Sequence, residues 1–158
     1  MKKLFSIAMI LMAEALFMIS WTTKTVDIDA EKAEISKIID AYCKTINDDD
    51  LELVNEIWSH GDEVSFIGPS GRYSTYNEIR DYFVHGVFGV NFTKRNLQKE
   101  EMSITVYGDA AWAEFNWVFD AIRNDGSSHN TKGRESQFFH KENGQWKLVH
   151  IHYSGRNR

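Results

Sequence analysis

The part of the chain after Gly89 constrains the fold most, because it reads as a series of strands separated by tight turns. β-Branched and aromatic residues are enriched there, and the series is broken at Gly108-Asp109, Asn124-Asp125-Gly126 and Glu142-Asn143-Gly144. Short clusters of Asn, Asp and Gly between such segments are typical of β-hairpins. This region therefore predicts about four consecutive antiparallel strands.

The chain before this region has the periodicity of helices. Apolar residues between Ile35 and Ile46 recur at every third or fourth position, which predicts one face of a long amphipathic helix. Asp29 is the expected N-cap of that helix, since a carboxylate can accept hydrogen bonds from the free N–H groups of the first turn. Asp49 and Glu52 have the spacing of a capping box and predict a second, shorter helix.

A third helix and a first strand complete the expected order of elements. Thr75 and Glu78 form another capping box, and an apolar helix face follows from Ile79 to Val87. Residues 63–67 alternate like a strand and lead into the turn at residues 68–71. Three such helices followed by a curved antiparallel sheet predict an α+β fold, a cone with room for a pocket at its wide end.

The composition fits one folded domain. The chain has 158 residues, of which 42% are hydrophobic and 26% charged, so it can bury a core and disorder is excluded. With 18 Lys and Arg against 23 Asp and Glu, the formal net charge is -5, and no stretch is densely basic. Nucleic acid is therefore not an expected partner. The single cysteine, Cys43, excludes an internal disulfide and a multi-cysteine zinc site.

The amino terminus has the layout of a secretory signal. Lys2 and Lys3 precede an apolar stretch over residues 4–19, interrupted by Glu14, that is short for a membrane span. We expect an exported protein, periplasmic or secreted, without membrane contact after cleavage; a retained amino-terminal anchor and a cytoplasmic protein are the alternatives. The expected boundaries are a signal peptide over residues 1–20, a linker over 21–30 and one domain over 31–155.

One face of a predicted strand is entirely apolar. Alternate residues of a strand point to opposite sides, so Ala113, Phe115, Trp117 and Phe119 share a side. In a sheet with one face in solvent, polar and apolar residues would alternate more regularly along the strand. We therefore interpret the apolar face as covered by another chain in a dimer or larger oligomer. The predicted interface consists of residues on the outside of the sheet: Phe115, Trp117, Phe138, His150 and His152.

The carboxyl-terminal strand carries the most specific motif, Trp146-Lys147-Leu148-Val149-His150-Ile151-His152-Tyr153-Ser154-Gly155. Together with the order of elements, this stretch resembles the nuclear transport factor 2-like (NTF2-like) superfamily and, within it, the SnoaL-like group. The resemblance is closest to the association domain of calcium/calmodulin-dependent protein kinase II, and it covers residues 31–155. It implies a cone-shaped, cystatin-like fold, oligomerisation through the outside of the sheet, and a deep pocket inside the cone.

The resemblance also suggests pocket positions. The kinase association domain carries arginines in its pocket, and the matching positions in this chain are Asn116, Gln137 and Tyr153. None is an arginine, so we expect a neutral, hydrogen-bonding and mostly apolar ligand rather than a small carboxylate. Arg134 is the nearest basic residue and a candidate ligand contact, with an exposed or interface ion pair as its alternative role. Trp58, near the predicted mouth of the cone, is a further candidate contact.

A cofactor-free enzyme of the isomerase type needs a buried carboxylate with a donor such as tyrosine nearby. Tyr42 lies on the inner face of the first helix and is the candidate donor. In the alternative interpretation Tyr42 belongs to the core, and the glutamates pair with Arg134 or Lys132, because buried unpaired carboxylates are costly. The candidate carboxylates and their polar neighbours are expected on one face: Glu114, Asn116, Glu135 and Gln137.

A metal site is not expected. His150 and His152 lie two apart on a strand and share one side, but no third ligand is evident in the sequence. No motif for a nucleotide or another cofactor is present either. We therefore expect neither a metal nor a cofactor, and interpret the two histidines as interface residues.

Three functions fit these observations. The first is an exported, oligomeric domain that binds a small, mostly apolar molecule in its cone, with or without turnover. The second is a cofactor-free isomerase, cyclase or dehydratase of the ketosteroid isomerase or SnoaL type, and the third is a non-catalytic assembly module. An enzyme should have a carboxyl group with a strongly raised pKa in its cavity, a binding protein should have a cavity without one, and an assembly module should have a filled cone.

Overall fold

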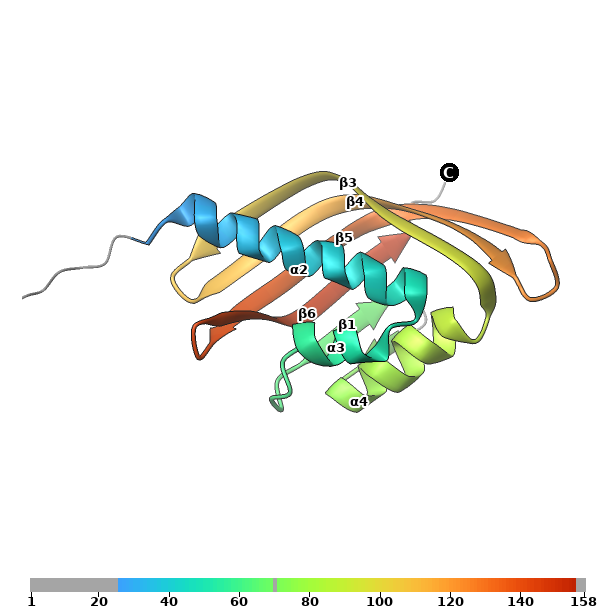
Figure 1. Cartoon of the computed structure of the whole chain (residues 1–158), viewed down its shortest axis with the longest axis horizontal. Helices are drawn as coiled ribbons and strands as arrows, with labels where there is room; N and C mark the ends of the chain where they lie inside the picture. The colour runs from blue at the N-terminus through green and yellow to red at the C-terminus, as the bar shows by residue number, and fades with distance from the viewer. Residues whose placement is uncertain (1–25, 70, 156–158) are drawn as a thin grey trace, which may run out of the picture.

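The computed structural model describes residues 26–69 and 71–155. The predicted signal peptide lies outside these residues, as does the predicted linker up to residue 25. Helices cover one face of a curved sheet, with α2 running across the strands and α3 and α4 side by side at one end (Figure 1). No helix within the described ranges is long and apolar enough to cross a membrane.

The first helix, α2 (Ile28–Asp48), begins earlier than the sequence suggested. Its N-cap is Asp27, whose carboxylate accepts hydrogen bonds from the backbone N–H groups of Asp29 and Ala30, both at 3.1 Å. The predicted cap, Asp29, was therefore wrong, because Asp29 lies inside the first turn, where a negative charge also favours the helix dipole.

The second helix, α3 (Leu51–Ile57), starts directly after the end of α2. Asp49 has a left-handed backbone, with φ 56°, and ends α2, while Asp50 caps α3 by accepting the N–H of Leu53 at 3.0 Å. The predicted cap at Asp49 was one residue too early. Consecutive aspartates can each serve as a cap, so the sequence alone does not fix which one does.

The third helical segment starts at the predicted capping box. The N–H of Glu78 donates to Oγ1 of Thr75 at 3.2 Å, and the carboxylate of Glu78 accepts the N–H of Ser74 at 2.8 Å. The segment begins as α4 (Tyr76–Glu78) and continues as the π-helix η1 (Ile79–Gly89), which buries an apolar side against the sheet. The predicted capping residues are confirmed, and Ile79 and Phe83 of the predicted apolar side are buried. Tyr82, which was predicted on the same side, is 65% exposed, because a π-helix has a wider turn than the α-helix from which the side was predicted.

A six-stranded sheet forms the other layer, in the order β2-β1-β6-β5-β4-β3. All neighbours are antiparallel except β1 and β6, which are parallel. The predicted α+β architecture is confirmed, and the predicted turns separate the last four strands. The strand bounds are β1 (Ser65–Gly68), β2 (Gly71–Tyr73), β3 (Phe92–Tyr107), β4 (Ala110–Arg123), β5 (Ser128–Glu142) and β6 (Gln145–Gly155).

The apolar face of β4 lies beneath the helices and not on the outside of the molecule. Phe115 and Trp117 are only 3% and 7% exposed within the single chain. The prediction that they form a subunit interface was therefore wrong, because the chain's own helices cover this face. The outer face instead carries Trp112 and Phe138, which are cross-strand partners and are 37% and 43% exposed.

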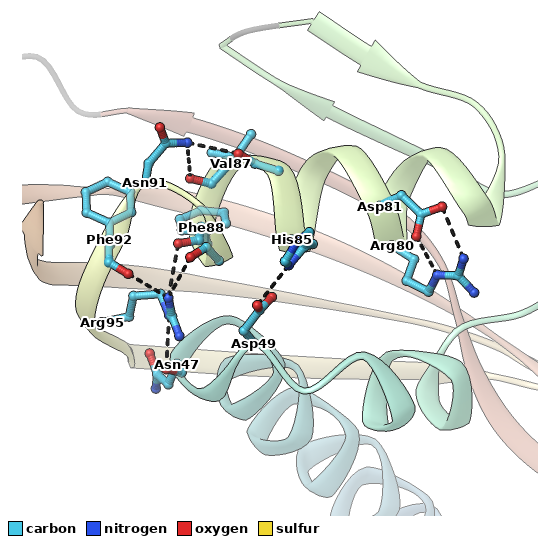
Figure 2. A network of polar contacts seen from close by, with 12 residues as sticks. Asn47, Asp49, Arg80, Asp81, His85, Val87, Phe88, Asn91, Phe92 and Arg95 are labelled. Atoms are coloured by element: carbon cyan, nitrogen blue, oxygen red, sulfur yellow. Dashed lines mark hydrogen bonds and ion pairs between the residues drawn. The ribbon is translucent and has the colours of Figure 1, made fainter. Parts of the chain in front are cut away.

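The end of the sheet near η1 is held by one arginine (Figure 2). The guanidinium group of Arg95 on β3 donates to the backbone carbonyl of Asn47 at 3.1 Å, at the end of α2. It also donates to the carbonyls of Phe88, Gly89 and Phe92, at 3.2, 3.3 and 2.8 Å. The carbonyls of Asn47, Phe88 and Gly89 belong to helix ends, where the last carbonyls lack intrahelical partners, and that of Phe92 belongs to β3 itself. Arg95 therefore ties α2, η1 and β3 together.

A second contact joins the same two helices. Nδ1 of His85 on η1 lies 2.9 Å from Oδ2 of Asp49 (Figure 2). Gly89 makes room for this carboxylate, since a Cβ at residue 89 would fall 2.4 Å from both of its oxygens. The α2–α3 turn is thereby fixed against the last turns of η1.

Candidate functional site

A cavity lies between the helices and the inner face of the sheet. Its volume is about 130 Å³, close to the ~150 Å³ of an engineered cavity that binds benzene. Side chains from α2, η1 and strands β3 to β6 surround it: Tyr42, Phe83, Val87, Phe88, Phe92, Leu97, Trp117, Phe119, His129, Thr131, Glu135 and Tyr153. The wall is therefore largely aromatic, and its one carboxyl group is that of Glu135.

Glu135 sits on the inner face of β5. It is directly opposite Phe115 on β4 and Tyr153 on β6, and it is 4% exposed. The side-chain amide of Gln137, itself fully buried, donates to Oε1 of Glu135 at 2.7 Å. No Lys, Arg or His among the described residues forms an ion pair with this carboxyl.

Burial without a counter-ion changes the proton affinity of this group. Loss of hydration raises the pKa of Glu135 to about 8, although hydrogen bonds from Gln137 and Tyr42 favour the charged form and oppose the rise. Burial, and then the charge of Glu135, raise the pKa of the Tyr42 hydroxyl well above its usual value. Burial and Glu135 also raise the pKa of Tyr153. One carboxyl group and two phenols therefore act on one another inside the cavity.

The polar groups at the other end of the cavity were not predicted. His129 and Thr131 precede Glu135 on β5 at alternate positions, so all three side chains face inward. Nδ1 of His129 accepts a hydrogen bond from Nη2 of Arg123. Continuing the alternation of β5 backward from Glu135 would have found both residues.

Three predicted site residues lie outside the cavity. Glu114, Asn116 and Arg134 are on the outer face of the sheet, and the side-chain amide of Asn116 donates to Glu101 at 2.5 Å. The expected cluster of Glu114 and Asn116 with Glu135 was wrong, because Glu135 pairs with Phe115 across the ladder and cross-strand partners share a face. Of the alternative interpretation, the core position of Tyr42 is confirmed, since this residue is 2% exposed. Its ion pairs of the glutamates with Arg134 or Lys132 do not form among the described residues.

The remaining predicted residues occupy separate places. Tyr42 and Tyr153 line the cavity, and Gln137 lies behind Glu135. Trp58 is buried beside Leu148 and does not line the cavity. The two histidines of β6 do not line the cavity: Nδ1 of His150 lies 2.8 Å from Oγ of Ser65, and His152 is exposed.

The cone of helices on a curved sheet, with a largely aromatic pocket between the two layers, defines a protein of the NTF2-like class. A family model described as the SnoaL-like domain matches residues 35–156, and the chain belongs to this family. An NTF2-like superfamily protein from Salmonella enterica serovar Typhimurium is 38% identical, with a TM-score of 0.79 over 83% of this chain and 94% of that one. The predicted superfamily is confirmed.

More distant solved structures share the fold. A hexachlorocyclohexane dehydrochlorinase, LinA type 2, is 13% identical, with a TM-score of 0.74 over 84% of this chain and 90% of that one. The association domain of CaMKII from C. elegans is 19% identical, with a TM-score of 0.64 over 80% of this chain and 96% of that one. At these identities the likeness concerns the fold alone.

Proposed function

We propose that this protein is a cofactor-free enzyme that moves a proton on a small, mostly apolar molecule held in the cavity. One observation carries the proposal: Glu135 is a buried carboxyl group that has no counter-ion among the residues the structure describes, its pKa is raised to about 8, and it lines an apolar cavity. A carboxylate with this pKa is a stronger base than an exposed one and is poised near neutral pH. Burying such a group without a partner is costly, which is why it suggests function.

The proposed step is proton abstraction next to a carbonyl group. Ionised Glu135 takes a proton from the carbon, the C–H electron pair forms a C=C bond, and the carbonyl π electrons move to oxygen. The hydroxyl of Tyr153, directly opposite Glu135 on β6, and that of Tyr42 on α2 are donors for the resulting enolate oxygen. Where a neighbouring C=C bond is conjugated with the enolate, the enolate electrons move through it, the far carbon takes the proton back from Glu135, and the C=C bond has shifted, so the isomerisation consumes no other reactant.

The cavity limits the class of substrate. Its volume suits a single six-membered ring, and the aromatic wall can bury an apolar body. A solved dehydrochlorinase shares the fold. Loss of HCl from a molecule includes the removal of a proton from carbon, which is the step proposed for Glu135. An unfilled cone argues against an assembly module as the sole role.

Deuterium exchange tests the proposal without knowledge of the natural substrate. Cyclohexanone in D₂O is incubated with the protein, and loss of the α-proton signal is followed by NMR. We expect exchange above the buffer rate, rising with pH to a plateau above about 8 as Glu135 ionises. Glu135→Gln should abolish the exchange, whereas Glu114→Gln on the outer face should not. If the ketone binds but its protons do not exchange, the catalytic role is excluded and the protein is a ligand-binding protein.

We also propose that copies of the chain associate through the outer face of the sheet. Trp112 and Phe138 form an exposed aromatic pair there, and the ring of His150 lies 5.6 Å from that of Phe138. Exposed aromatic patches of this kind are characteristic of interfaces. Export remains a proposal that rests on the amino-terminal pattern, and comparison of the intracellular and exported fractions of the native host tests it.

A further inference from the structure

A cationic group stands at the end of the cavity opposite Glu135. Arg123 at the end of β4 and His129 at the start of β5 are joined by the Nη2 to Nδ1 hydrogen bond. Both lie against Phe92: the guanidinium carbon is 5.9 Å from the ring centroid, and the imidazole centroid is 5.2 Å from it. His129 and Phe92 line the cavity, so the Arg123 charge adjoins its wall.

The contact fixes the proton on the imidazole ring. An arginine side chain can only donate, so Nδ1 of His129 is the acceptor and the ring is neutral, with its proton on Nε2. Burial, and then the nearby charge of Arg123, lower the pKa of His129, in agreement with this form. The pair therefore combines one full positive charge with a second N–H donor.

The charge of Arg123 is not neutralised by a carboxylate at contact distance within residues 26–69 and 71–155. Its Nη1 donates to the backbone carbonyl of Ser128 at 3.4 Å, a long bond to a neutral group. Asp125 in the hairpin turn accepts hydrogen bonds from the N–H and the hydroxyl of Ser127, at 2.9 and 2.6 Å. These bonds, and to a lesser degree the charge of Arg123, lower the pKa of Asp125. The guanidinium can therefore accept an additional anionic partner.

The two ends of the cavity thus differ in the charge that they favour. Thr131 and Gly133 separate His129 from Glu135 on the inner face of β5, so these two groups mark opposite ends. An anion beside Glu135 would lose its hydration among aromatic side chains and meet a second acid. An anion beside Arg123 would gain a charge-assisted hydrogen bond.

We infer that the pocket orients its ligand, with an anionic head at Arg123 and His129 and an apolar body toward Glu135, so that small apolar monocarboxylates are its preferred ligands. This inference rests on the proposed function, because it concerns the same cavity. It keeps the apolar body of the ligand that the sequence predicted but replaces the predicted neutral polar groups with one anionic head. A dicarboxylate such as malonate lacks the apolar body and is not expected to bind.

A matched pair of ligands tests the inference. Binding of 3-phenylpropionate and 3-phenylpropionamide is measured by calorimetry at pH 7, because the two differ mainly in charge. We expect the acid to bind roughly fivefold more tightly than the amide, and added NaCl to weaken the binding of the acid alone. Arg123→Gln should abolish the preference for the acid over the amide, and Arg134→Gln on the outer face should preserve that preference.

The outcomes separate the two proposals. Equal affinities in the wild-type protein, or a preference that survives Arg123→Gln, would overturn the orientation and leave the proton-transfer proposal standing. If neither compound binds, the inference fails, while cyclohexanone exchange still decides the proposed function. Because the salt dependence uses only the wild-type protein, the inference can be refuted even if the Arg123 variant does not fold.

Discussion

Gly133 on β5 lies directly opposite Trp117 on β4, and a Cβ atom at residue 133 would fall 2.4 Å from Cζ2 of the indole ring. The same atom would lie 2.2 Å from the backbone oxygen of Ser154. The indole therefore occupies the space that a side chain at residue 133 would need. Trp117 also meets Tyr153 edge to face, at 5.5 Å between ring centroids, so this glycine sets the position of two cavity residues.

Gly133→Ala should consequently destabilise the fold by about 1–3 kcal/mol, because the methyl group meets both backbone and a buried ring. Urea unfolding measures the change in free energy. Gly155→Ala is the matched control, since Gly155 is the cross-strand partner of Gly133 and a Cβ there meets nothing within 4 Å. Equal stability of the two variants would show that the Trp117 ring can move aside without cost.

The free energy of unfolding should fall as the pH rises from about 5 to 8. Folded Glu135 keeps its proton up to about pH 8, whereas the unfolded chain releases it near 4.5, so the unfolded state binds fewer protons in this window. The contribution of this group is on the order of a few kcal/mol. Urea unfolding across this pH range should show a shallower slope for Glu135→Gln than for wild type and Glu114→Gln. Parallel slopes would mean that Glu135 ionises normally.

Replacing Arg95 should loosen the attachment of the helices to β3. Arg95→Met leaves four backbone carbonyls without the guanidinium donor, and we expect a loss of about 2–3 kcal/mol. Hydrogen exchange should show faster opening at the ends of α2 and η1 than in β5. Lys94→Met, at the neighbouring exposed position, is the control. Uniform protection in both variants would contradict the role of Arg95.

Self-association should depend on the aromatic pair outside the sheet. Phe138→Lys places a charge beside Trp112 and should shift the protein toward monomer in sedimentation velocity at micromolar concentration. Tyr82→Lys, at an exposed position of η1, should leave association unchanged. A wild-type protein that sediments as a monomer would overturn the proposed interface.

The thiol of Cys43 should be unreactive in the folded protein. It lies in the core, and burial, followed by the charge of Glu135, raises its pKa to about 12. Thiolate is the reactive form, so labelling by a disulfide reagent at pH 8 should be slow until the chain is unfolded. Rapid labelling of native protein would place Cys43 outside the core.

The order of helices and strands could be predicted because its signals are local. Thr75 with Glu78, and the Gly-containing turns such as Asn143-Gly144, act within a few residues of one another, so no tertiary knowledge is needed. The exact caps were missed by one or two residues where several aspartates compete. Asp27 and Asp50 cap the helices, and each has another aspartate within two positions.

The faces of the strands could not be predicted from single strands. Alternation correctly grouped Phe115 with Trp117, but which group faces the helices depends on packing between distant segments. The same uncertainty placed Glu114 beside Glu135, although the ladder puts Glu135 opposite Phe115. Tyr42 was found because its helix has a strong period, while His129 was missed although it lies on the same side of β5 as Glu135.

The Arg95 contacts have a consequence for how the cavity of this chain can change. The guanidinium binds backbone carbonyls, which every residue type carries, so the side chains at residues 47, 88, 89 and 92 are not what it recognises. Phe88 and Phe92 can thus be exchanged, and the cavity reshaped, while the frame around it keeps its attachment. Substitutions in the cavity wall therefore need not disturb the attachment of the helices to β3. One fold can in this way acquire new ligands through single substitutions that are each tolerated.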